Sequence, residues 1–490
     1  MNDHYDVLVI GGGPGGTPAA MQLASGGKKV LLVERSGKLG GACLFVGCIP
    51  SKIIKHAADE YAAISRIAFG GKAAPENRSD AWRNIRTTMD RILSGRSGAA
   101  LQRVNRLPTL TFVAGTARFV AKDRVEIEDD GGAKRTCTFE QAIIATGSVP
   151  TVPPFGGNGA KHVLTTEMLF VQEALPESLV IIGGGPIGIE MAQMLTKLSV
   201  TCTIIEMQDT ILKGLVEPEF ADRLAQKLSE SDIAVHTSAK VQEINRSGDE
   251  FSTTFLGAEG GVKTLQSRNV LVAAGRRPNV EGLDLEAAGI ECTKSGIAVN
   301  EYLETNVKGI YAAGDVTSGP KFAHTATYED HIAAANILQG HVRKTELAKN
   351  SWVLFSDPEI ASAGYTEAEA ARHGYEVGTG TYDYRIDAAA QISGNPEGLL
   401  KFVVDRRTLQ IIGVHLCFNG AASAIGEGAL IVSRQLTLMD VAQVIHPHPT
   451  LTEAFGVLAM TMLAGMGASA ARPSGAAGRP QERGSGRSAA

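Results

Sequence analysis

Residues 7–34 read VLVIGGGPGGTPAAMQLASGGKKVLLVE, and this stretch decides the fold. Its apolar start, residues 7–10, meets a glycine turn, and a run of small residues then leads to a second apolar segment, residues 29–33, which is closed by Glu34. The glycines of the turn are Gly11, Gly13 and Gly16. This spacing lets a strand turn sharply into a helix and brings the backbone close to a diphosphate, while the acid after the second strand can accept hydrogen bonds from ribose hydroxyls. The stretch therefore predicts a strand–helix–strand unit that binds a dinucleotide.

The same pattern returns at residues 178–206, which read SLVIIGGGPIGIEMAQMLTKLSVTCTIIE. Its turn contains Gly183, Gly185 and Gly188, and Glu206 closes its second strand. From the first glycine to the closing acid the distance is 23 positions in both copies. Two unrelated glycine turns with a purely structural role would not be expected to share this register. We therefore predict two dinucleotide-binding domains in one chain.

Three later segments indicate how the two domains are connected. QAIIATGSVP (141–150) and NVLVAAGRRPN (269–279) each contain an apolar strand that ends in a glycine turn, and GIYAAGD (309–315) follows the second copy. We therefore expect the chain to return to the first domain, which makes the second domain an insertion. The predicted parts are residues 1–150 and 277–347 for the first domain, 151–276 for the inserted domain, 348–466 for an interface domain and 467–490 for a disordered tail.

Composition and charge argue against several classes of protein. The chain has 490 residues, of which 44% are hydrophobic, and its 47 lysines and arginines against 52 acidic residues give a net charge of −5. No basic block is long enough to follow a phosphate backbone, so we expect no nucleic acid partner. The amino terminus lacks the basic segment of a secretory signal, and no apolar run reaches the ~18 residues that span a bilayer. We therefore expect a cytoplasmic protein with no membrane partner.

Two of the six cysteines stand close together in GGACLFVGCIPSK, residues 40–52. A chain kept reduced would hold no structural disulfide, and the spacing of Cys43 and Cys48 does not resemble a zinc ribbon, so the pair is catalytic, metal-binding or accidental. Residues 51–64 predict a helix, whose amino terminus lowers the pKa of a nearby thiol. Cys48 is nearer to that helix and is therefore the better thiolate. The other four cysteines, which stand singly and are expected to be buried and inert, are Cys137, Cys202, Cys292 and Cys417.

Two dinucleotide sites in one chain suit an electron relay, because hydride passes between a flavin and a nicotinamide ring only when the rings are in contact. The cysteine segment, the two glycine turns, ATGS, GRRPN, AAGD and the late HPHPTLTE (446–453) together resemble the flavin-dependent pyridine nucleotide–disulfide oxidoreductases, most closely the dihydrolipoyl dehydrogenases. The resemblance covers roughly residues 5–465. It implies an α/β fold of two Rossmann-like domains, with the NAD-binding domain inserted in the FAD-binding domain, followed by an α+β dimerisation domain.

The resemblance also implies an activity, which is the oxidation of protein-bound dihydrolipoyl groups or free dihydrolipoamide by a homodimer, through FAD, with reduction of NAD+ to NADH. Cys43 and Cys48 would form the redox disulfide, with Cys43 exchanging with the dithiol and Cys48 contacting the flavin. Lys52 would stand near the flavin N5 and pair with Glu190. The implied FAD-binding residues are Gly11, Gly13, Gly16, Glu34, Lys52, Thr146, Gly147, Asp315 and Ala323, and the implied NAD-binding residues are Gly183, Gly185, Gly188, Glu206 and Gly275. We predict no metal site.

The histidine segment has two interpretations. Thr450 and Glu453 stand three positions apart before an apolar run and fit a capping box, so the segment can be simply the start of a helix. His446 and His448, however, flank a proline where no apolar periodicity would bury them, and imidazole has a pKa that suits a base for a dithiol. The resemblance assigns the base to His448 and its orienting carboxylate to Glu453, and implies that His448 acts on the flavin and disulfide of the other subunit. Glu453 can serve both purposes.

The acid that closes the second unit bears on the choice of nucleotide. Glu206 should accept hydrogen bonds from the adenosine ribose of NAD, whereas the 2′-phosphate of NADP would meet it as a like charge. The next three residues, Met207, Gln208 and Asp209, include no arginine to compensate. The sequence therefore predicts NAD as the nucleotide.

Some positions differ from the usual dihydrolipoyl dehydrogenase pattern, namely Ala42, Phe45 and Thr325, and they leave the lipoyl carrier open. Residues 390–402 look like the soluble transhydrogenase branch, which would need no disulfide. A mercuric or glutathione-type reductase would take electrons from NADPH, but no vicinal cysteine pair follows residue 417 and the second unit ends in an acid. The non-catalytic alternative is a flavoprotein that only binds a partner or reports redox state.

Overall fold

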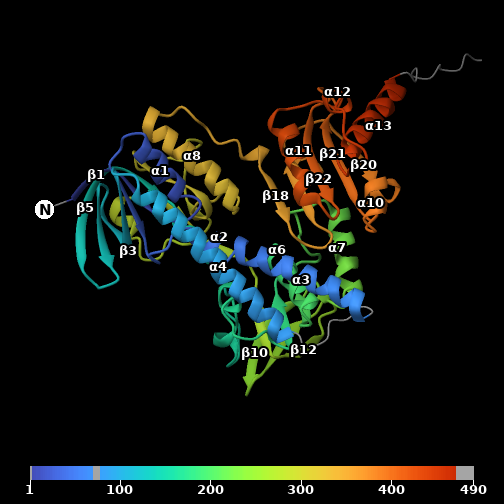
Figure 1. The fold of residues 1–490 in the computed structure, drawn as a ribbon, viewed down its shortest axis with the longest axis horizontal. Helices are drawn as coiled ribbons and strands as arrows, with labels where there is room; N and C mark the ends of the chain where they lie inside the picture. The colour runs from blue at the N-terminus through green and yellow to red at the C-terminus, as the bar shows by residue number, and fades with distance from the viewer. Residues whose placement is uncertain (1–2, 70–77, 471–490) are drawn as a thin grey trace, which may run out of the picture. The chain divides into compact units, whose positions relative to one another are not determined.

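The computed structural model describes residues 3–69 and 78–470. The chain divides after Ala361 into two compact units, each of which is described by itself (Figure 1). The last helix, α13 (Glu453–Ala470), includes the first residues of the segment predicted as a tail, and the rest of that segment, residues 471–490, lies outside the described residues.

The first unit is built around the sheet that carries the first glycine turn. Its strands are β1 (Asp3–Ile10), β2 (Val30–Glu34), β3 (Leu110–Ala121), β4 (Arg124–Asp129), β5 (Lys134–Ile144) and β17 (Ile310–Ala312). β1 pairs in parallel with β2 and β5, β2 pairs in parallel with β3, and β3, β4 and β5 form an antiparallel meander that completes a closed ring of pairings. β17 pairs in parallel with β5, with Ile310 opposite Ala142. The chain therefore returns to the first sheet after the second domain, as predicted.

The strands next to the turn are apolar on both faces because both faces are covered. Val7 and Val9 of β1 face one core cluster and Leu8 and Ile10 face another, and all four are at most 4% exposed. Parallel strands buried in this way show continuous rather than alternating apolar residues. α1 (Thr17–Ser25) and α8 (Ala323–Gln339) pack against each other over one face. The continuous apolar run of β1 thus reflects burial between two layers.

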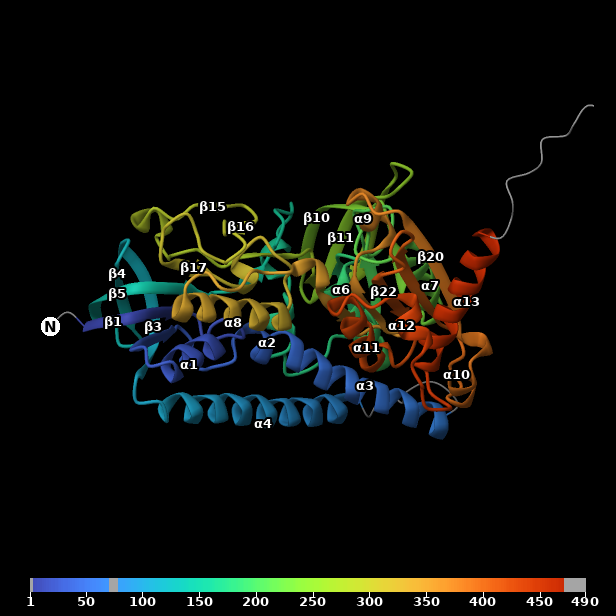
Figure 2. The ribbon, with the colours of Figure 1, turned by 90° about the horizontal axis from the view of Figure 1, so that it is seen from above.

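Three further helices follow β2. α2 (Gly41–Phe45) contains the first close cysteine and α3 (Cys48–Phe69) begins at the second. α4 (Arg78–Asn105) is the longest described helix, and α3 and α4 lie side by side, as Figures 1 and 2 show. The predicted helix at residues 51–64 is therefore present, but it begins three residues earlier than the sequence indicated.

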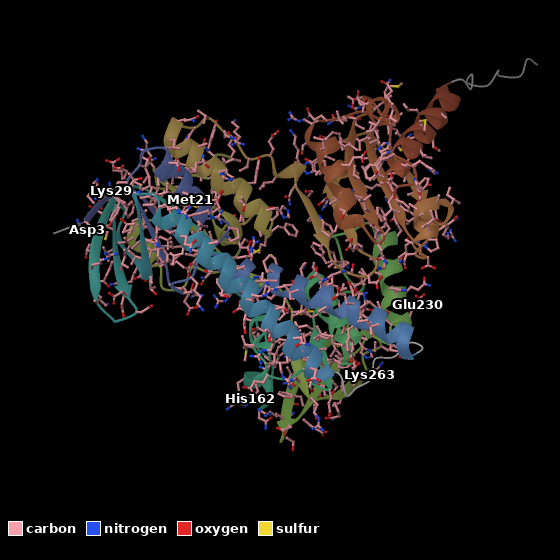
Figure 3. All side chains as sticks on the ribbon, viewed as in Figure 1. Asp3, Met21, Lys29, His162, Glu230 and Lys263 are labelled. Carbon is pink, nitrogen blue, oxygen red and sulfur yellow. The ribbon has the colours of Figure 1, made fainter. Side chains whose placement is uncertain are left out.

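The inserted part of the first unit forms a second parallel sheet. Its strands, in spatial order, are β13 (Asn269–Val272), β7 (Ser178–Ile182), β8 (Thr201–Ile205) and β9 (Ala234–His236), and its helices are α5 (Thr166–Leu169), α6 (Pro186–Lys197) and α7 (Pro218–Glu230). An antiparallel sheet of β10 (Lys240–Ser247), β11 (Glu250–Leu256) and β12 (Val262–Ser267) shares its core through Phe251 and Phe255. Figure 3 labels His162 and Lys263 in this part.

Short strands mark the connections of the first unit. β6 (Ser148–Pro150) pairs with β14 (Arg276–Pro278) where the chain leaves the first sheet and where it comes back. β15 (Cys292–Thr293), β16 (Gly296–Ile297) and β18 (Ser351–Leu354) complete the unit. The prediction of an inserted dinucleotide-binding domain is confirmed by this topology.

The second unit is an antiparallel sheet with helices. Its strands run in the order β19, β22, β21, β20, and β19 (Ile360–Gly364) begins just before the division. The bounds of the others are Val377–Asp383 for β20, Leu399–Asp405 for β21 and Ile411–Cys417 for β22, and the helices are α9 (Glu367–Arg372), α10 (Ala388–Ile392), α11 (Ala421–Ser433), α12 (Leu438–Ala442) and α13. α11 packs on β22, and α13 packs on β20 and β21. This is the α+β domain that the resemblance implied.

Three of the four isolated cysteines are buried as predicted, and one is not. Cys137, Cys202 and Cys417 are buried, as expected, but Cys292 is exposed, so that expectation is wrong for Cys292. The reason is that Cys292 lies in a two-residue strand whose residues are both exposed. Within residues 3–69 and 78–470, no helix is both long and apolar enough to cross a bilayer.

Candidate redox and dinucleotide sites

The first glycine turn is tight enough to require glycine at two positions. Gly11 has a φ of +111°, and a Cβ there would lie 2.3 Å from the carbonyl oxygen of Ala145. A Cβ on Gly16 would lie 2.0 Å from the carbonyl oxygen of Gly11. Both distances are far below van der Waals contact, so any other residue would force the strand, the turn and the helix apart. The turn therefore brings the amino end of α1 against the end of β1.

The second turn repeats this geometry at the end of β7. Gly183 has a φ of +119°, and a Cβ there would lie 2.5 Å from the carbonyl oxygen of Ala273. A Cβ on Gly188 would lie 2.0 Å from the carbonyl oxygen of Gly183. By contrast, nothing lies within 4 Å of a Cβ built on Gly185. The amino end of α6 thus faces open space.

Neither helix is capped by the side chain of its own N-cap residue. The N-cap residues are Gly16 for α1 and Gly185 for α6, neither helix has a side-chain cap, and neither has an acid in its first turn. The amino end of a helix carries a positive partial charge, and such an end after a glycine turn suits a diphosphate. The residues present therefore fit the diphosphates of two dinucleotides.

The closing acids of the two units occupy equivalent positions. Glu34 Oε2 accepts a hydrogen bond from Gly12 N at 2.7 Å, and Glu206 Oε2 accepts one from Gly184 N at 2.5 Å. The other oxygen of Glu206 accepts from Gln208 N at 2.7 Å. These bonds aim each carboxylate at its glycine turn and leave lone pairs for ribose hydroxyls. An ion pair in the residues after Glu206 was not anticipated from the sequence: Lys213 Nζ pairs with Asp209 at 2.9 Å.

The remaining predicted flavin contacts cluster at the ends of β5 and β17. Thr146 Oγ1 donates to the carbonyl of Asn279 at 2.7 Å, and the Asn279 side chain donates back to the Thr146 carbonyl at 3.1 Å. Asp315 Oδ2 accepts from Ser148 Oγ at 2.6 Å, and Ala323 begins α8. The predicted glycines next to this cluster, Gly147 (φ +72°) and Gly275 (φ +106°), both have left-handed backbone angles. The structure thus gathers these residues at the strand ends, where α/β folds bind ligands.

The close cysteines form a polarised pair of free thiols. Cys43 is in α2 and Cys48 opens α3. The Cys43 thiol donates a hydrogen bond to the Cys48 sulfur and the Lys52 ammonium lies near it, which together lower the pKa of Cys48 to about 7 although burial opposes this. The same hydrogen bond raises the pKa of Cys43 above its ordinary value. Near neutral pH the pair can therefore hold one thiol and one thiolate, with Cys48 as the thiolate.

Lys52 is held by an ion pair with a nearly buried acid. Its Nζ lies 2.8 Å from Glu190 Oε2, and the Glu190 side chain, on α6, is only 11% exposed. Glu190 Oε1 accepts a hydrogen bond from Phe355 N at 2.9 Å, and the Lys52 ammonium lies 4.3 Å from the centre of the Phe355 ring. Lys52 follows Cys48 by one helical turn, so the two side chains share a face of α3. The arrangement fixes a positive charge beside the cysteine pair.

The histidine segment of the second unit contains two imidazole–carboxylate pairs. His448 Nδ1 lies 3.0 Å from Glu453 Oε1, and the His448 side chain is 73% exposed. Glu453 also accepts a hydrogen bond from Thr450 N at 2.8 Å. This bond, and to a smaller extent the contact with His448, holds the pKa of Glu453 below its usual value. Only this half of the predicted capping box forms, because Thr450 Oγ1 donates to the Pro447 carbonyl instead. His448 therefore presents Nε2 outward while Nδ1 is held.

The second histidine differs from what the sequence suggested. His446 Nε2 pairs with Glu427 Oε1 at 2.8 Å, and its side chain is only 8% exposed. The expectation that nothing would bury His446 is wrong, because a residue 19 positions away in the chain supplies its partner. Of the two histidines, His448 is the one that a substrate can reach.

Sequence reasoning missed two buried acids and a clamp. Burial raises the pKa of Glu329 to about 7 and that of Asp330 to about 8, and the two acids are 1% and 0% exposed. The clamp is a pair of hydrogen bonds from one side chain: Gln193 Nε2 donates to the Asp357 carbonyl and Gln193 Oε1 accepts from Asp357 N, both at 2.8 Å. Neither feature has a local sequence signal, since the partners come from distant parts of the chain.

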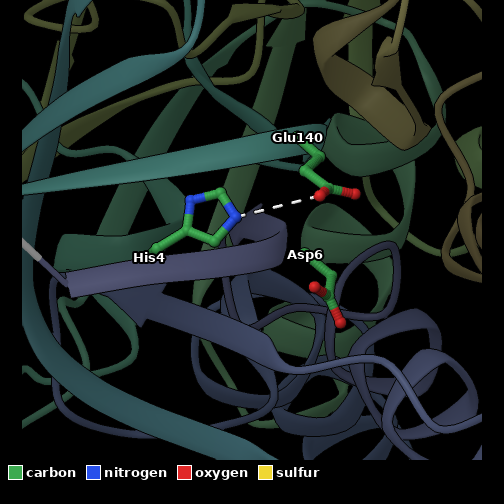
Figure 4. Close-up of side chains that lie close together, drawn as sticks. All are labelled: His4, Asp6 and Glu140. Carbon is green, nitrogen blue, oxygen red and sulfur yellow. Dashed lines mark ion pairs between the residues drawn. The ribbon is translucent and has the colours of Figure 1, made fainter.

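A separate cluster lies at the start of the first sheet (Figure 4). One ligand atom each from His4, Asp6 and Glu140 lies within 4.8 Å of the others, and His4 Nε2 is 3.8 Å from Glu140 Oε1. Both side chains of this ion pair are more than half exposed, so solvent screens it. We assign no metal to the cluster, and the absence of a metal site stays a prediction.

Comparison with sequence families gives two matches. The family described as "Pyridine nucleotide-disulphide oxidoreductase" matches residues 5–329, and its "dimerisation domain" matches residues 350–459. Together the two matches take in both glycine turns, the cysteine pair and the histidine segment.

Individual relatives point to more than one activity. The chain is 33% identical to the mitochondrial dihydrolipoyl dehydrogenase of Pisum sativum over 94% of its own length and 91% of that protein. It is 31% identical to the mercuric reductase of Lysinibacillus sphaericus over 94% of its own length and 83% of that protein. Among solved structures, the Cu(II) complex of the HOCl-induced flavoprotein disulfide reductase RclA from Escherichia coli superposes with a TM-score of 0.82 at 24% identity, covering 94% of this chain and all of that one. This last likeness concerns the fold.

Proposed function

The chain belongs to the pyridine nucleotide-disulphide oxidoreductase family, whose cofactors are FAD and a nicotinamide dinucleotide, and from this premise we propose that it is an NAD-dependent dihydrolipoyl dehydrogenase. Its substrate would be a protein-bound dihydrolipoyl group, or free dihydrolipoamide. The observation that carries the proposal is the polarised Cys43–Cys48 pair, in which Cys48 has a pKa of about 7. A thiol that titrates near neutral pH is a good leaving group in thiol–disulfide exchange.

The first half of the reaction is an exchange between two dithiol–disulfide couples. His448, with Nδ1 held by Glu453, removes a proton from one substrate thiol at Nε2. The substrate thiolate attacks Cys43 of the Cys43–Cys48 disulfide, and Cys48 leaves as a thiolate. The second substrate sulfur then attacks the substrate sulfur of the mixed disulfide, which closes the lipoyl ring, and its proton passes to Cys43. Two electrons now reside on the cysteine pair, and His448 keeps one proton.

The second half returns the pair to the disulfide. Bound FAD supplies a two-electron relay between the cysteine pair and the nicotinamide ring. The Cys43 thiol loses its proton as the disulfide closes again, and the cysteine pair thereby gives up one proton and two electrons, the equivalent of the hydride that NAD+ gains. His448 releases the remaining proton to solvent. The sum is a dithiol and NAD+ converted to a disulfide, NADH and one proton.

Residues around the cysteine pair would support both halves. The Lys52 ammonium, held by Glu190, stabilises the Cys48 thiolate by its charge. We place FAD against the amino end of α1 and NAD against that of α6, because each end follows a glycine turn and has no acid in its first turn to oppose a diphosphate. We also propose a homodimer in which His448 serves the cysteine pair of the partner subunit, which the matched dimerisation domain supports.

A steady-state assay tests the proposal. Turnover is measured with free dihydrolipoamide and then with lipoylated carrier proteins, each with NAD+ and NADP+. We expect reduction of NAD+ by free dihydrolipoamide and a higher kcat/KM with at least one carrier. An enzyme that oxidises no dithiol, although its flavin is bound and reduced by NADH, would overturn the proposal.

A second function is favoured by the likeness to mercuric reductase. Such an enzyme would take electrons from a reduced nucleotide and deliver them through the same cysteine pair. The chain has no cysteine after Cys417, however, so it lacks a second thiol pair near its carboxyl end. Oxidation of NADPH that depends on mercuric ion or a disulfide, without dithiol oxidation, would select this function.

A further inference from the structure

We propose that Phe355 is a positioning residue, whose ring and backbone N–H together hold the Lys52–Glu190 pair so that the Lys52 ammonium stays beside the Cys48 sulfur. The inference rests on the proposed function, because it concerns the thiolate that the reaction uses. Phe355 follows β18, and it is far in sequence from both α3 and α6.

The first contact acts on Glu190. Phe355 N donates to Glu190 Oε1 at 2.9 Å, which leaves Oε2 to accept from Lys52 Nζ at 2.8 Å. Each carboxylate oxygen thus has its own donor, and the side chain cannot turn without losing both bonds. A nearly buried carboxylate that is fixed in this way directs its partner ammonium along one line.

The second contact acts on Lys52 itself. The centre of the Phe355 ring lies 4.3 Å from Lys52 Nζ, which is within the range of cation–π attraction. The ring also takes the place of water on one side of the ammonium, so less solvent screens its charge from Cys48. The ring therefore strengthens the field that Lys52 exerts on the sulfur.

The segment that carries Phe355 is itself anchored to α6. The Gln193 amide bonds the backbone of Asp357 on both sides at 2.8 Å, and Lys197 Nζ reaches the Asp357 carboxylate at 2.9 Å. Gln193 and Lys197 follow Glu190 on successive turns of α6, so one helix face binds the whole segment. Phe355 is therefore placed by the same helix that supplies Glu190.

The charged and titratable groups that act on the Cys48 sulfur, within the described residues, are Cys43, Lys52 and Glu190. Cys43 and Lys52 favour the thiolate, and Glu190 opposes it. Of these, the inference concerns Lys52 and the Glu190 carboxylate that holds it. The ring contact with Lys52 can be separated from the bond to Glu190, because a substitution of the Phe355 side chain keeps the backbone N–H.

The test follows alkylation of Cys48 in the reduced holoenzyme by iodoacetamide as a function of pH. Phe355→Leu should raise the midpoint of this profile and slow alkylation at pH 7 by roughly two- to fivefold, because the less confined ammonium favours the thiolate less. Phe355→Trp, which restores an aromatic face, should bring the profile back toward wild type. Tyr302→Leu is the matched control, since it removes the ring 5.3 Å from Lys344 without touching Lys52.

A double-mutant comparison separates positioning from a general structural effect. In a Lys52→Met background, Phe355→Leu should leave the Cys48 profile unchanged, because the ammonium on which the ring acts is gone. An equal shift in both backgrounds, or an unshifted profile for Phe355→Leu alone, would overturn the inference. Alkylation needs no dithiol substrate, so the result stands apart from whether dihydrolipoamide is turned over.

Discussion

At the scale of single residues, the chemistry depends on which sulfur carries the negative charge. Cys48 opens α3, accepts the hydrogen bond of the Cys43 thiol and lies near the Lys52 ammonium, and all three features favour its thiolate. Cys43 keeps its proton and is the better target for an external thiolate once the disulfide has formed. The proposed division of labour between the two cysteines follows from these contacts.

Substitution of the flavin-facing sulfur tests this division. Cys48→Ser should abolish dithiol oxidation and the long-wavelength absorption that a thiolate next to a flavin gives in the two-electron-reduced enzyme, because serine stays protonated and forms no disulfide. The measurement is an anaerobic titration with NADH followed by absorption spectroscopy. Survival of that absorption band in the variant would show that Cys48 is not the sulfur at the flavin.

The proposed base can be tested in the same way. His448→Gln should leave flavin binding and reduction by NADH unchanged, while dihydrolipoamide oxidation falls by the ~10²–10⁴-fold typical of a lost acid–base group. The two half-reactions are measured separately by stopped-flow absorption. The matched control is His446→Gln, which removes the imidazole paired with Glu427. A near-normal rate of dithiol oxidation in His448→Gln would show that His448 is not the base and that the histidine segment only starts a helix.

We propose that the choice of nucleotide depends on the Glu206 carboxylate. A 2′-phosphate next to Glu206 would meet a like charge, so we expect wild type to prefer NAD over NADP by at least ~10²-fold in kcat/KM. Glu206→Arg should narrow or reverse that ratio, and Lys213 near Asp209 offers a second cation in the variant. The measurement is kcat/KM for both nucleotides in both proteins. Comparable use of NADP by wild type would remove Glu206 as the selector.

At the scale of elements, the buried acids of α8 make stability depend on pH. The folded-state pKa of Asp330, about 8, lies above the value of an exposed aspartate, so the folded protein binds the proton more tightly than the unfolded chain. Stability from this group is therefore complete below about pH 4 and is lost as pH rises through about 8. One carboxyl changes the free energy of unfolding by at most about 1.4 kcal/mol per pH unit.

The prediction is that Asp330→Asn flattens this dependence. The melting temperature of the wild type, relative to the variant, should fall as pH rises from 5 to about 8, because only the wild type must then charge a group with no exposed surface. Thermal unfolding at several pH values measures this. Parallel profiles for the two proteins would show that Asp330 does not titrate in this range.

The elements also show what the sequence could and could not predict. Glycine turns and apolar strands are local patterns, so both strand–helix–strand units and the return of β17 were predicted from them. The sequence predicts that α3 starts at Ser51 rather than Cys48, because a proline at position 50 suggests a break before the helix. In the structure that proline lies in the first turn, where its missing N–H has no cost. The contacts of Phe355 and Asp330 join segments distant in sequence, and no local pattern reports them.

At the scale of the whole molecule, the second unit carries apolar side chains that are exposed within the single chain. Ile445 is 97% exposed, and Leu430 and Met460 are more than half exposed, on or next to helices of the domain matched as a dimerisation domain. Covering these apolar side chains with a second subunit would remove them from water, which is favourable. They support the proposed homodimer.

Mixed dimers test whether each site is shared between subunits. Cys48→Ser and His448→Gln chains, each inactive in dithiol oxidation, are co-expressed. If Cys48 of one subunit works with His448 of the other, each mixed dimer regains one intact site, and random pairing gives about a quarter of wild-type activity. Activity no higher than that of the separate variants would place both groups in one subunit.

The twelve residues of α6 lie between the proposed nucleotide site and the residues that hold Lys52. Its first turn is the proposed nucleotide end, and its later turns carry Glu190, Gln193 and Lys197, which bind Lys52, the Asp357 backbone and the Asp357 carboxylate. The two ends of this short helix are joined by one continuous series of backbone hydrogen bonds. Any influence of a bound nucleotide on the sulfurs must be matched by an equal influence of the sulfurs on the nucleotide. On the proposal that NAD binds at the first turn, α6 connects the nucleotide directly to the residue that holds Lys52 near the sulfurs.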